Sequence, residues 1–400
     1  MARESTSGRG PRSAAEHRAS PWCRTRRRAA RIAVAAGPAA AAGAAILWSP
    51  VAHPDGIALL LLGMTIGAVL LATGFGFAGS WRGWISAGHG AGLRAQFVML
   101  GLATCLFIPT LAAGRLFGNP IAGAVAPAGV SVAVGAFLFG IGMQFAGGCA
   151  SGTLVAAGAG NPRLIVVLIA FVAGAVAGTA QLPWWLARPS LGEVSLPETV
   201  GPVPAVLLQL TALAVLFLLV SLRKGPASQT WREVIRIPWP LLGAAVALAL
   251  LNFATLAVTG HPWSITFGFG LWGAKILAAM GADIENWTFW SWPFPAEALA
   301  APVLADTTTV MNIGIVCGAL VVATWRRRRE GPRIPAMSLR TAGAALLGGV
   351  LMGYGARLAF GCNIGALFGG IASGSLHGWL WLAAAMAGSV VGVRLWPRRT

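Results

Sequence analysis

The chain has 400 residues, of which 56% are hydrophobic and only 10% are charged. This composition lies outside the range of soluble globular proteins and excludes that class. Several charge-free apolar runs are long enough for a helix to span about 30 Å of hydrocarbon, so we predict a polytopic membrane protein embedded in the lipid bilayer. The 54 glycines fit this prediction, because small residues let transmembrane helices approach closely.

The net charge of +18 does not indicate a nucleic-acid partner once its position in the chain is considered. The arginines cluster in short segments beside apolar runs, which is the distribution that the positive-inside rule predicts. We therefore expect topology signals and lipid-headgroup contacts, and no nucleic acid. The clusters lie at 24–31, 223–236, 326–333 and 398–399.

The five cysteines form no CxxC pair and no spacing typical of a disulfide framework, so we expect free thiols. They are Cys23, Cys105, Cys149, Cys317 and Cys362. No histidine lies within four residues of a cysteine, which disfavours a metal site, and no other cofactor is expected.

In chain order, residues 1–31 are polar and arginine-rich and are predicted to be a disordered cytoplasmic tail. The next segment, 32–56, contains an apolar run at 33–48 that is either the hydrophobic part of a signal or an extra first transmembrane helix. The helix is the simpler reading in a multi-pass chain. Nine further apolar segments follow, at 57–73, 95–113, 128–147, 163–183, 204–222, 238–259, 301–324, 341–360 and 376–394.

These segments predict ten crossings with a cytoplasmic N-terminus. Counting from inside, the alternation places the arginine-rich segments 223–237, 325–340 and 395–400 in the cytoplasm. It places 184–203 and 260–300 outside, where five of the eleven acidic residues collect. The tryptophan-rich stretch 287–292 would then hold interfacial anchors, with substrate collection as an alternative.

One motif occurs twice, at 142–152 and 355–365, and reads G-x-[Q/R]-[F/L]-A-x-G-C-x-x-G. The interval between its cysteines, Cys149 and Cys362, is almost the interval between Cys105 and Cys317. The glycine-phenylalanine segments at 74–77 and 266–269 also match, and each precedes a cation, Arg82 or Lys275.

The matches predict two repeats, 57–183 and 238–394, joined by a connector with one transmembrane helix at 184–237 and followed by a tail at 395–400. The topology places corresponding loops on opposite faces, so the repeats are predicted to be inverted. Irregular backbone is tolerated at membrane depth only where it is buried or lines a polar cavity, so we predict re-entrant loops.

The chemistry of the two cysteine loops suits an anion. We expect Ser151 and Asn363 to cap short helices. Cys149 and Cys362, beside Gly148 and Gly361, would then lie at half-helix N-termini, where free backbone N–H groups favour negative charge. A neutral thiol also offers a weak hydrogen-bond donor and a polarizable surface for a sulfur-bearing anion.

Arg357 lies inside a predicted helix near the external mouth and is a candidate to attract that anion. Its alternatives are snorkelling to the surface or pairing with a loop carbonyl. The matching residue, Gln144, is polar but uncharged, which suits weaker binding towards the cytoplasm. Cys105 and Cys317 are either small apolar filler or a second layer of thiols.

The eleven acidic residues fall in tails, loops or helix ends, so no carboxylate relay for proton coupling is visible. The pattern predicts a channel-like or facilitated path, or a coupling that the sequence does not reveal.

The chain resembles the YeeE/YedE family of bacterial membrane proteins over 57–394. The resemblance rests on the duplicated A-x-G-C-x-x-G segments, the Phe-Gly-Phe loop followed by a basic residue, and Asn-Ile-Gly-Ile at 312–315. It implies a transporter of sulfur compounds, with thiosulfate uptake the characterised activity of the family. It also implies an hourglass of re-entrant loops in which thiosulfate passes between cysteine thiols by transient S–H hydrogen bonds.

The resemblance implies that Cys149 and Cys362 are two functional cysteines. The family has a third cysteine in its first phenylalanine-containing loop, where this chain has Gly76. We therefore predict uptake of a small sulfur-containing anion, most simply thiosulfate, by a non-enzymatic transporter of the bacterial inner membrane. Two alternatives stay open: a transporter of another sulfur or selenium species, and a membrane thiol enzyme that passes sulfane sulfur to a soluble TusA-like sulfurtransferase. Such a sulfurtransferase would also be compatible with transport.

Overall fold

The computed structural model describes residues 41, 43, 53–223, 235–330 and 337–396. The predicted tail at 1–31 and most of the extra helix at 32–56 lie outside these ranges. Within them, nine helical segments are long and apolar enough to cross a membrane. This confirms an all-α polytopic membrane protein, and nine is the predicted number of crossings once the run at 33–48 is set aside.

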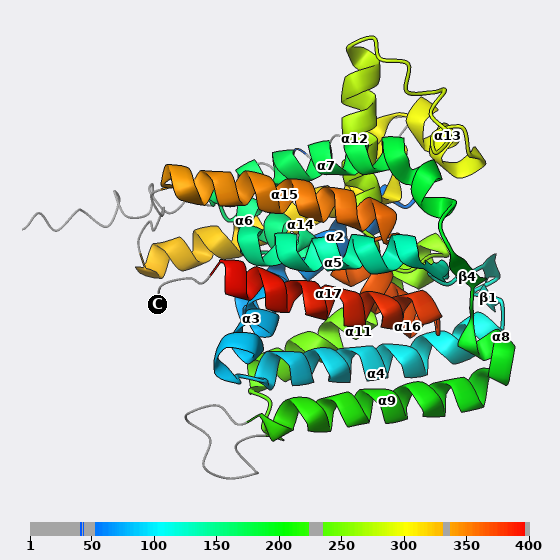
Figure 1. The fold of residues 1–400 in the computed structure, drawn as a ribbon, viewed down its shortest axis with the longest axis vertical. Helices are drawn as coiled ribbons and strands as arrows, with labels where there is room; N and C mark the ends of the chain where they lie inside the picture. Colours follow the sequence, from blue (N-terminus) through cyan, green and yellow to red (C-terminus); the bar gives the residue numbers. More distant parts are fainter. Residues whose placement is uncertain (1–40, 42, 44–52, 224–234, 331–336, 397–400) are drawn as a thin grey trace, which may run out of the picture.

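Long helices run side by side through one bundle (Figure 1). A helix satisfies its backbone hydrogen bonds internally, which is why these apolar sequences adopt it in a membrane. The long helices are α2 (Gly56–Thr73), α4 (Ala91–Ala112), α5 (Val130–Ala146), α7 (Pro162–Leu186), α9 (Pro202–Leu222), α11 (Trp239–Thr259), α14 (Thr307–Glu330), α15 (Leu339–Leu358) and α17 (Leu376–Leu395).

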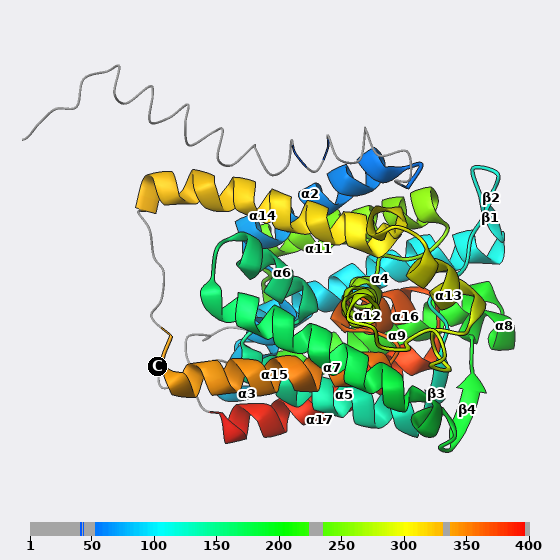
Figure 2. The same ribbon diagram turned by 90° about the horizontal axis from the view of Figure 1, so that it is seen from above.

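Short elements interrupt the long helices. They are α3 (Phe77–Ala87), α6 (Ala150–Gly158), α8 (Leu196–Val200), α12 (Thr266–Ala279), α13 (Pro293–Ala300), a 3-10 helix at Val303–Ala305, a π-helix at Asn363–Gly369 and α16 (Gly370–Ala372). Two antiparallel strand pairs, too short for a sequence pattern to reveal, join β1 (Arg115–Leu116) to β2 (Asn119–Pro120) and β3 (Pro127–Gly129) to β4 (Ser190–Glu193). Helix α12 stands across the bundle in Figure 1 and is seen end-on in Figure 2.

Helices α5 and α15 cross in antiparallel contact through glycine. A Cβ atom on Gly142 would lie 2.7 Å from the carbonyl oxygen of Gly348, and one on Gly348 would lie 2.8 Å from that of Gly142. Towards the other end of the pair, a Cβ atom on Gly135 would lie 2.7 Å from the carbonyl oxygen of Gly355. The two backbones therefore touch directly, at a distance that a side chain would prevent.

The other long contacts also join the two predicted repeats. Helix α2 packs on α14, α4 on α11, α7 on α15, and α5 on α17 as well as on α15. In the first of these, Gly63 and Gly67 of α2 meet the backbone of α14, and Gly314 and Gly318 of α14 meet that of α2. The two halves of the chain are thus interleaved within one core, whereas their inverted symmetry stays a prediction.

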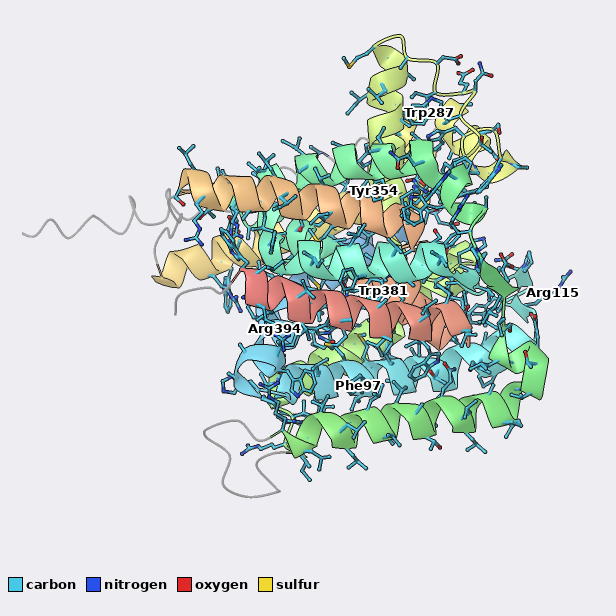
Figure 3. The ribbon with its side chains drawn as sticks, in the orientation of Figure 1. Phe97, Arg115, Trp287, Tyr354, Trp381 and Arg394 are labelled. Carbon is cyan, nitrogen blue, oxygen red and sulfur yellow. The ribbon has the colours of Figure 1, made fainter. Side chains whose placement is uncertain are left out.

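The helix ends that flank the arginine-rich segments 223–236 and 326–333 meet at one end of the bundle. Helices α9, α14 and α17 end there and α15 begins there, at the left of Figure 1, whereas β1, β4 and α8 lie at the right. Arg394 and Arg115 mark the two ends in Figure 3. We call these the arginine-rich end and the strand end. The arrangement has the asymmetry that the positive-inside rule describes.

The tryptophan-rich stretch 287–292 differs from its prediction as a set of interfacial anchors. Trp290 is only 2% exposed, and Phe289 is buried beside it against α12 and α7. Trp292 remains 36% exposed, as an anchor would be. The anchor prediction is wrong for Phe289 and Trp290, because these rings fill the space between the crosswise helix α12 and the bundle.

The glycine contact between α5 and α15 predicts a matched pair of outcomes on α15. Gly348→Ala places a methyl group against the backbone of α5 and should destabilise the protein by about 1–3 kcal/mol, as overpacking of a close contact does. Gly343→Ala, on the same helix but with nothing within 4 Å of its Cβ position, should be neutral or slightly stabilising. Thermal unfolding in detergent measures both, and equal transitions would contradict the assigned contact.

Candidate functional site

Cys149 stands at the N-terminus of the short helix α6. Helix α5 ends at Ala146, and Gly147 takes a left-handed conformation (φ +80°) that turns the chain back into the bundle. Cys149 follows in an extended conformation as the N-cap residue and is only 2% exposed. Its Sγ atom lies 3.3 Å from Oγ of Ser151. The thiol is therefore buried at a helix N-terminus, with a hydroxyl as its neighbour.

Cys362 has the same place at the start of the π-helix. The turn before it uses Phe360 at φ +56° and Gly361 at φ +148°, both in the region that favours glycine. The Cys362 Sγ atom accepts a hydrogen bond from the Ile364 backbone N–H at 3.4 Å. Trp381 of α17, labelled in Figure 3, donates its indole N–H to the Gly361 carbonyl oxygen at 3.2 Å. Contacts from both flanking segments thus fix a strained turn that holds the thiol.

The predicted capping roles of Ser151 and Asn363 are wrong. The N-cap residues are the cysteines themselves, because each helix begins at the residue directly after its cysteine. Ser151 lies inside the first turn of α6 and contacts the thiol instead. Asn363 is fully buried, and both polar atoms of its amide lack a hydrogen-bond partner among the described residues. Each thiol therefore lies nearer to the helix N-terminus than predicted.

The two cysteine loops enter the bundle from opposite ends. Helix α6 leads to the arginine-rich end, where α7 begins, and the π-helix with α16 leads to the strand end, where α17 begins (Figures 1 and 2). The thiols of Cys149 and Cys362 are both buried and belong to one hydrophobic core cluster. The structure therefore places the two cysteines that the sequence motif singled out in the same core.

On the side of Cys149, polar groups gather at the C-terminal end of α5. Gln144 is 1% exposed, and neither polar atom of its side-chain amide has a partner in the described ranges. Arg82 of α3 donates to the Gln144 carbonyl oxygen at 2.9 Å, and Arg163 of α7 donates to that of Phe145 at 2.6 Å. These cations satisfy carbonyls left open at the helix end. Arg163 was not predicted, because nothing in its local sequence links it to α5.

On the side of Cys362, Arg357 lines a cavity of about 530 Å³. Its guanidinium carbon stands 4.2 Å from the ring centroid of Phe289, and its Nη2 atom is enclosed without a hydrogen-bond partner among the described residues. This environment does not match snorkelling, since the side chain is held inside rather than at the surface. Gly361 lines the same cavity, so Arg357 and the Cys362 loop share one space.

Gly76 is the N-cap residue of α3, in an extended conformation (φ −163°) that any residue can adopt, and nothing lies within 4 Å of its Cβ position. Its carbonyl oxygen accepts from the side-chain amide of Gln96 at 3.3 Å. In the second half, Asn312 donates in the same way to the carbonyl oxygen of Ile265, the N-cap residue of α12. The available signal for these two contacts was a single amide side chain within each of two apolar helices, α4 and α14.

Cys105 and Cys317 do not share one environment. Cys105 is exposed on α4, whereas Cys317 is buried in α14. Cys105 and Cys317 are thus separated by almost the same interval as Cys149 and Cys362, but they differ in exposure. In the part of the chain that the structure describes, no three His, Cys, Asp or Glu side chains gather as metal ligands.

Comparison with known proteins identifies a family for this chain. A family model described as sulphur transport matches residues 72–391. The chain is 33% identical to the probable transporter YedE of Escherichia coli K12 over 156 residues, which are 39% of this chain and 37% of that protein. It is 27% identical to the thiosulfate transporter TsuA of Spirochaeta thermophila over 342 residues, 80% of this chain and 93% of that protein. The thiosulfate transporter TsuA of Escherichia coli K12 is 29% identical over 274 residues, 64% of this chain and 71% of its own. The match with YedE thus spans well under half of that relative.

The glycines of the Cys362 turn and of the loop before α3 should respond differently to an added side chain. Gly361→Ala should destabilise the Cys362 turn by about 1–3 kcal/mol, because φ is +148° and the new Cβ atom would lie 2.7 Å from the Ala366 backbone nitrogen. Gly76→Ala and Gly76→Cys should leave the thermal transition in detergent nearly unchanged, since both backbone and space accept a side chain. A loss of stability in the Gly76 variants as large as that in Gly361→Ala would contradict the assigned geometry.

Proposed function

The chain belongs to the sulphur transport family, and from this premise we propose that it carries a small sulfur-containing anion, thiosulfate, across the bacterial inner membrane into the cytoplasm. One observation carries the proposal. Two buried free thiols, Cys149 and Cys362, stand at the N-termini of short helices that enter from opposite ends, and both belong to one buried core cluster. Two relatives are named thiosulfate transporter TsuA, which supports thiosulfate as the substrate.

The proposed path uses transient, non-covalent contacts. In a site of low dielectric, a neutral thiol donates its S–H hydrogen to an anion, and a polarizable sulfur surface suits the terminal sulfur of thiosulfate. The backbone N–H groups at each helix N-terminus lower the cost of the negative charge. Because the two thiols belong to opposite loops and lie in one buried core cluster, the proposed route takes the anion from Cys362 to Cys149 through the interior.

Other polar groups of the two loops would accompany the anion. The amides of Asn363 and Gln144 are buried without a partner in the described ranges, and such groups are costly unless something else supplies hydrogen bonds. The Ser151 hydroxyl lies beside Cys149. Gly148 and Gly361, which precede the cysteines, bring backbone rather than side chains to the path. We propose these groups, together with Arg357, as the substrate-binding set.

The proposed orientation places the arginine-rich end in the cytoplasm, following the positive-inside rule. The cavity beside Arg357 then opens towards the outside, which suits uptake of an anion. Inverted repeats form part of the proposal. They are supported by the contact of the motif-bearing helices α5 and α15, in which Gly142 of one meets Gly348 of the other.

A membrane thiol enzyme is the alternative from another class. The Cys149 thiolate would attack the sulfane sulfur of thiosulfate, break its S–S bond and release sulfite, which leaves a persulfide on Cys149. The outer sulfur of that persulfide would then pass to the thiol of a soluble acceptor, which must reach it. The 2% exposure of Cys149 favours a small anion over a protein acceptor at that atom. A TusA-like sulfurtransferase in the cytoplasm stays a predicted partner that would receive the anion after transport.

Uptake of labelled thiosulfate by proteoliposomes tests the thiol path. Cys149→Ala and Cys362→Ala should each reduce the initial rate by about tenfold or more, which is the effect of losing one hydrogen bond to a charged group. Cys105→Ala, at an exposed thiol of α4, should keep the wild-type rate.

Two outcomes would count against the proposal. Full uptake in both buried-thiol variants would remove the thiols from the path. A persulfide on Cys149, detected by mass spectrometry after incubation with thiosulfate and lost on addition of a sulfurtransferase, would favour the enzyme instead.

Cysteine labelling tests the orientation. In a background with Cys23 and Cys105 replaced by alanine, Glu193→Cys, exposed on strand β4 at the strand end, should react with an impermeant maleimide on intact cells. Ser338→Cys, at the start of α15, should react only after the membrane is opened. The reverse pattern would place the arginine-rich end outside.

A further inference from the structure

An apolar groove lies on the side of the bundle where α9 runs past α4 and α17. It has a volume of about 590 Å³, and the described residues that line it are all apolar or aromatic. Helix α4 lies between α17 and α9 in Figure 1, and its Phe97 is labelled in Figure 3. Phe97, Leu382 of α17 and Val220 of α9 are buried and form the floor of the groove. Val215 and Leu219 of α9 are about half exposed and form its rim.

Trp379 and Trp84 line the groove and attach α9 to its neighbours. Trp379 of α17 donates its indole N–H to Oε1 of Gln209 in α9 at 3.1 Å. Trp84 of α3 donates in the same way to the Val220 carbonyl oxygen at 3.3 Å, where α9 approaches the arginine-rich end. Helix α9 is therefore held against α17 and α3 at two points, and the groove lies between them.

The groove follows only part of α9. Its lining residues in this helix run from Ala212 to Val220, in the half that ends at the arginine-rich end. At 1.5 Å per residue this stretch is about 12 Å long, whereas one leaflet of hydrocarbon is about 15 Å deep and a full crossing about 30 Å. A transmembrane helix of a second copy would cross the whole bilayer, whereas a lipid acyl chain occupies one leaflet. The length of the groove therefore fits an acyl chain.

Cations gather where the groove reaches the arginine-rich end. Arg223 is exposed, and its guanidinium carbon lies 5.8 Å from the ring centroid of Trp84, within the range of a cation–π contact. Arg94 of α4 lies beside Val220, because a Cβ atom on Gly90 would be 2.6 Å from Arg94 Nη1 and 2.8 Å from Val220 Cγ1. The buried Nε atom of Arg94 has no hydrogen-bond partner among the described residues. An anionic group at this end would therefore meet an exposed guanidinium and the field of a second cation.

The two ends of the groove differ in charge. Beyond the end at Trp84, the sequence of 223–236 holds four cations and one carboxylate. At the other end, Trp379 meets the uncharged amide of Gln209. A phospholipid has the same polarity, with an apolar chain that ends at a charged headgroup. The groove and its cations thus complement an anionic lipid in both shape and charge.

We propose that this groove binds one anionic phospholipid from the leaflet at the arginine-rich end. One acyl chain lies along Val215 and Leu219, between α9 and α17, and the phosphate lies at Arg223 beside Trp84. Arginines near the membrane surface attract anionic headgroups in this way. The bound lipid fills the space between α9 and the core, so it also stabilises the connector helix. The site is independent of the sulfur substrate.

Native mass spectrometry of the purified full-length protein, with added dioleoyl phosphatidylglycerol or dioleoyl phosphatidylcholine, tests the acyl-chain site. Wild type should retain one phosphatidylglycerol in preference to phosphatidylcholine. Ala383→Phe places a ring in the groove and should weaken both lipids by about tenfold, the effect of excluding a few methylene groups. Ala387→Phe, at an exposed alanine one turn further along α17 and outside the groove, is the matched control and should bind as wild type does.

A charge variant tests the headgroup position in the same measurement. Arg223→Gln should weaken phosphatidylglycerol by about fivefold and leave phosphatidylcholine unchanged, because one arginine near the surface attracts an anionic lipid by about that factor. Arg340→Gln is its control, since Arg340 is exposed at the same end of the bundle and stacks on the Trp396 ring at 4.7 Å, away from the groove. This variant should keep the wild-type preference.

Three results would overturn the lipid site. One is wild-type retention of phosphatidylglycerol in both Ala383→Phe and Arg223→Gln. Another is equal binding of the two lipids by wild type. The third is a lipid-free dimer that Ala383→Phe dissociates and Ala387→Phe does not, which would assign the groove to a second copy of the chain. If Ala383→Phe fails to fold, Arg223→Gln decides the question through the lipid preference, because this residue is exposed at the end of α9.

Discussion

The direct backbone contact between α5 and α15 is the constraint on which the rest of the structure depends. Both helices carry the duplicated motif at their C-terminal ends, so their crossing decides where the two cysteine loops begin. Gly142 and Gly348 allow an approach that any side chain would prevent. Because the helices are antiparallel, the loops start on opposite ends and turn inwards. Van der Waals packing of small residues is what drives such association when lipid is as apolar as the helices themselves.

The inward turns have a physical cost that explains the residues around them. Each short helix exposes unpaired N–H groups at its start, and each long helix before it leaves carbonyl groups open at its end. Arg82 and Arg163 satisfy carbonyls at the end of α5, and Trp381 satisfies the carbonyl of Gly361. At the start of the π-helix, the Ile364 backbone N–H donates to the Cys362 Sγ atom, whereas the side-chain amide of Asn363 has no partner among the described residues. The protein thus satisfies the carbonyl groups at the ends of the long helices but not the side-chain amide of Asn363. Under the proposed function, a bound anion would supply hydrogen bonds to such groups.

The sequence predicted the long helices and the two cysteine loops because their signals are local. Apolar runs have the length of a bilayer crossing, and the repeated motif places Cys149 and Cys362 at equivalent turns. It did not predict contacts between distant segments, such as Phe289 on Arg357. It also misjudged the caps, since Ser151 has a favourable capping side chain but the turn makes Cys149 the N-cap residue. Phe360 shows the same limit: tertiary packing holds a bulky residue in a left-handed conformation that local preference assigns to glycine.

The two copies of the motif differ in charge at one matching position. Arg357 and Gln144 occupy matching positions, and both carry polar atoms that find no partner in the described chain. A cation at each end would hold an anion tightly at two sites and slow its release. An uncharged amide near Cys149 keeps hydrogen-bonding capacity while it removes the strongest attraction from that side. Net movement needs binding that is favourable enough to enter but weak enough to leave. Under the proposed function, the uncharged Gln144 would therefore favour movement from the cavity beside Arg357 towards the arginine-rich end.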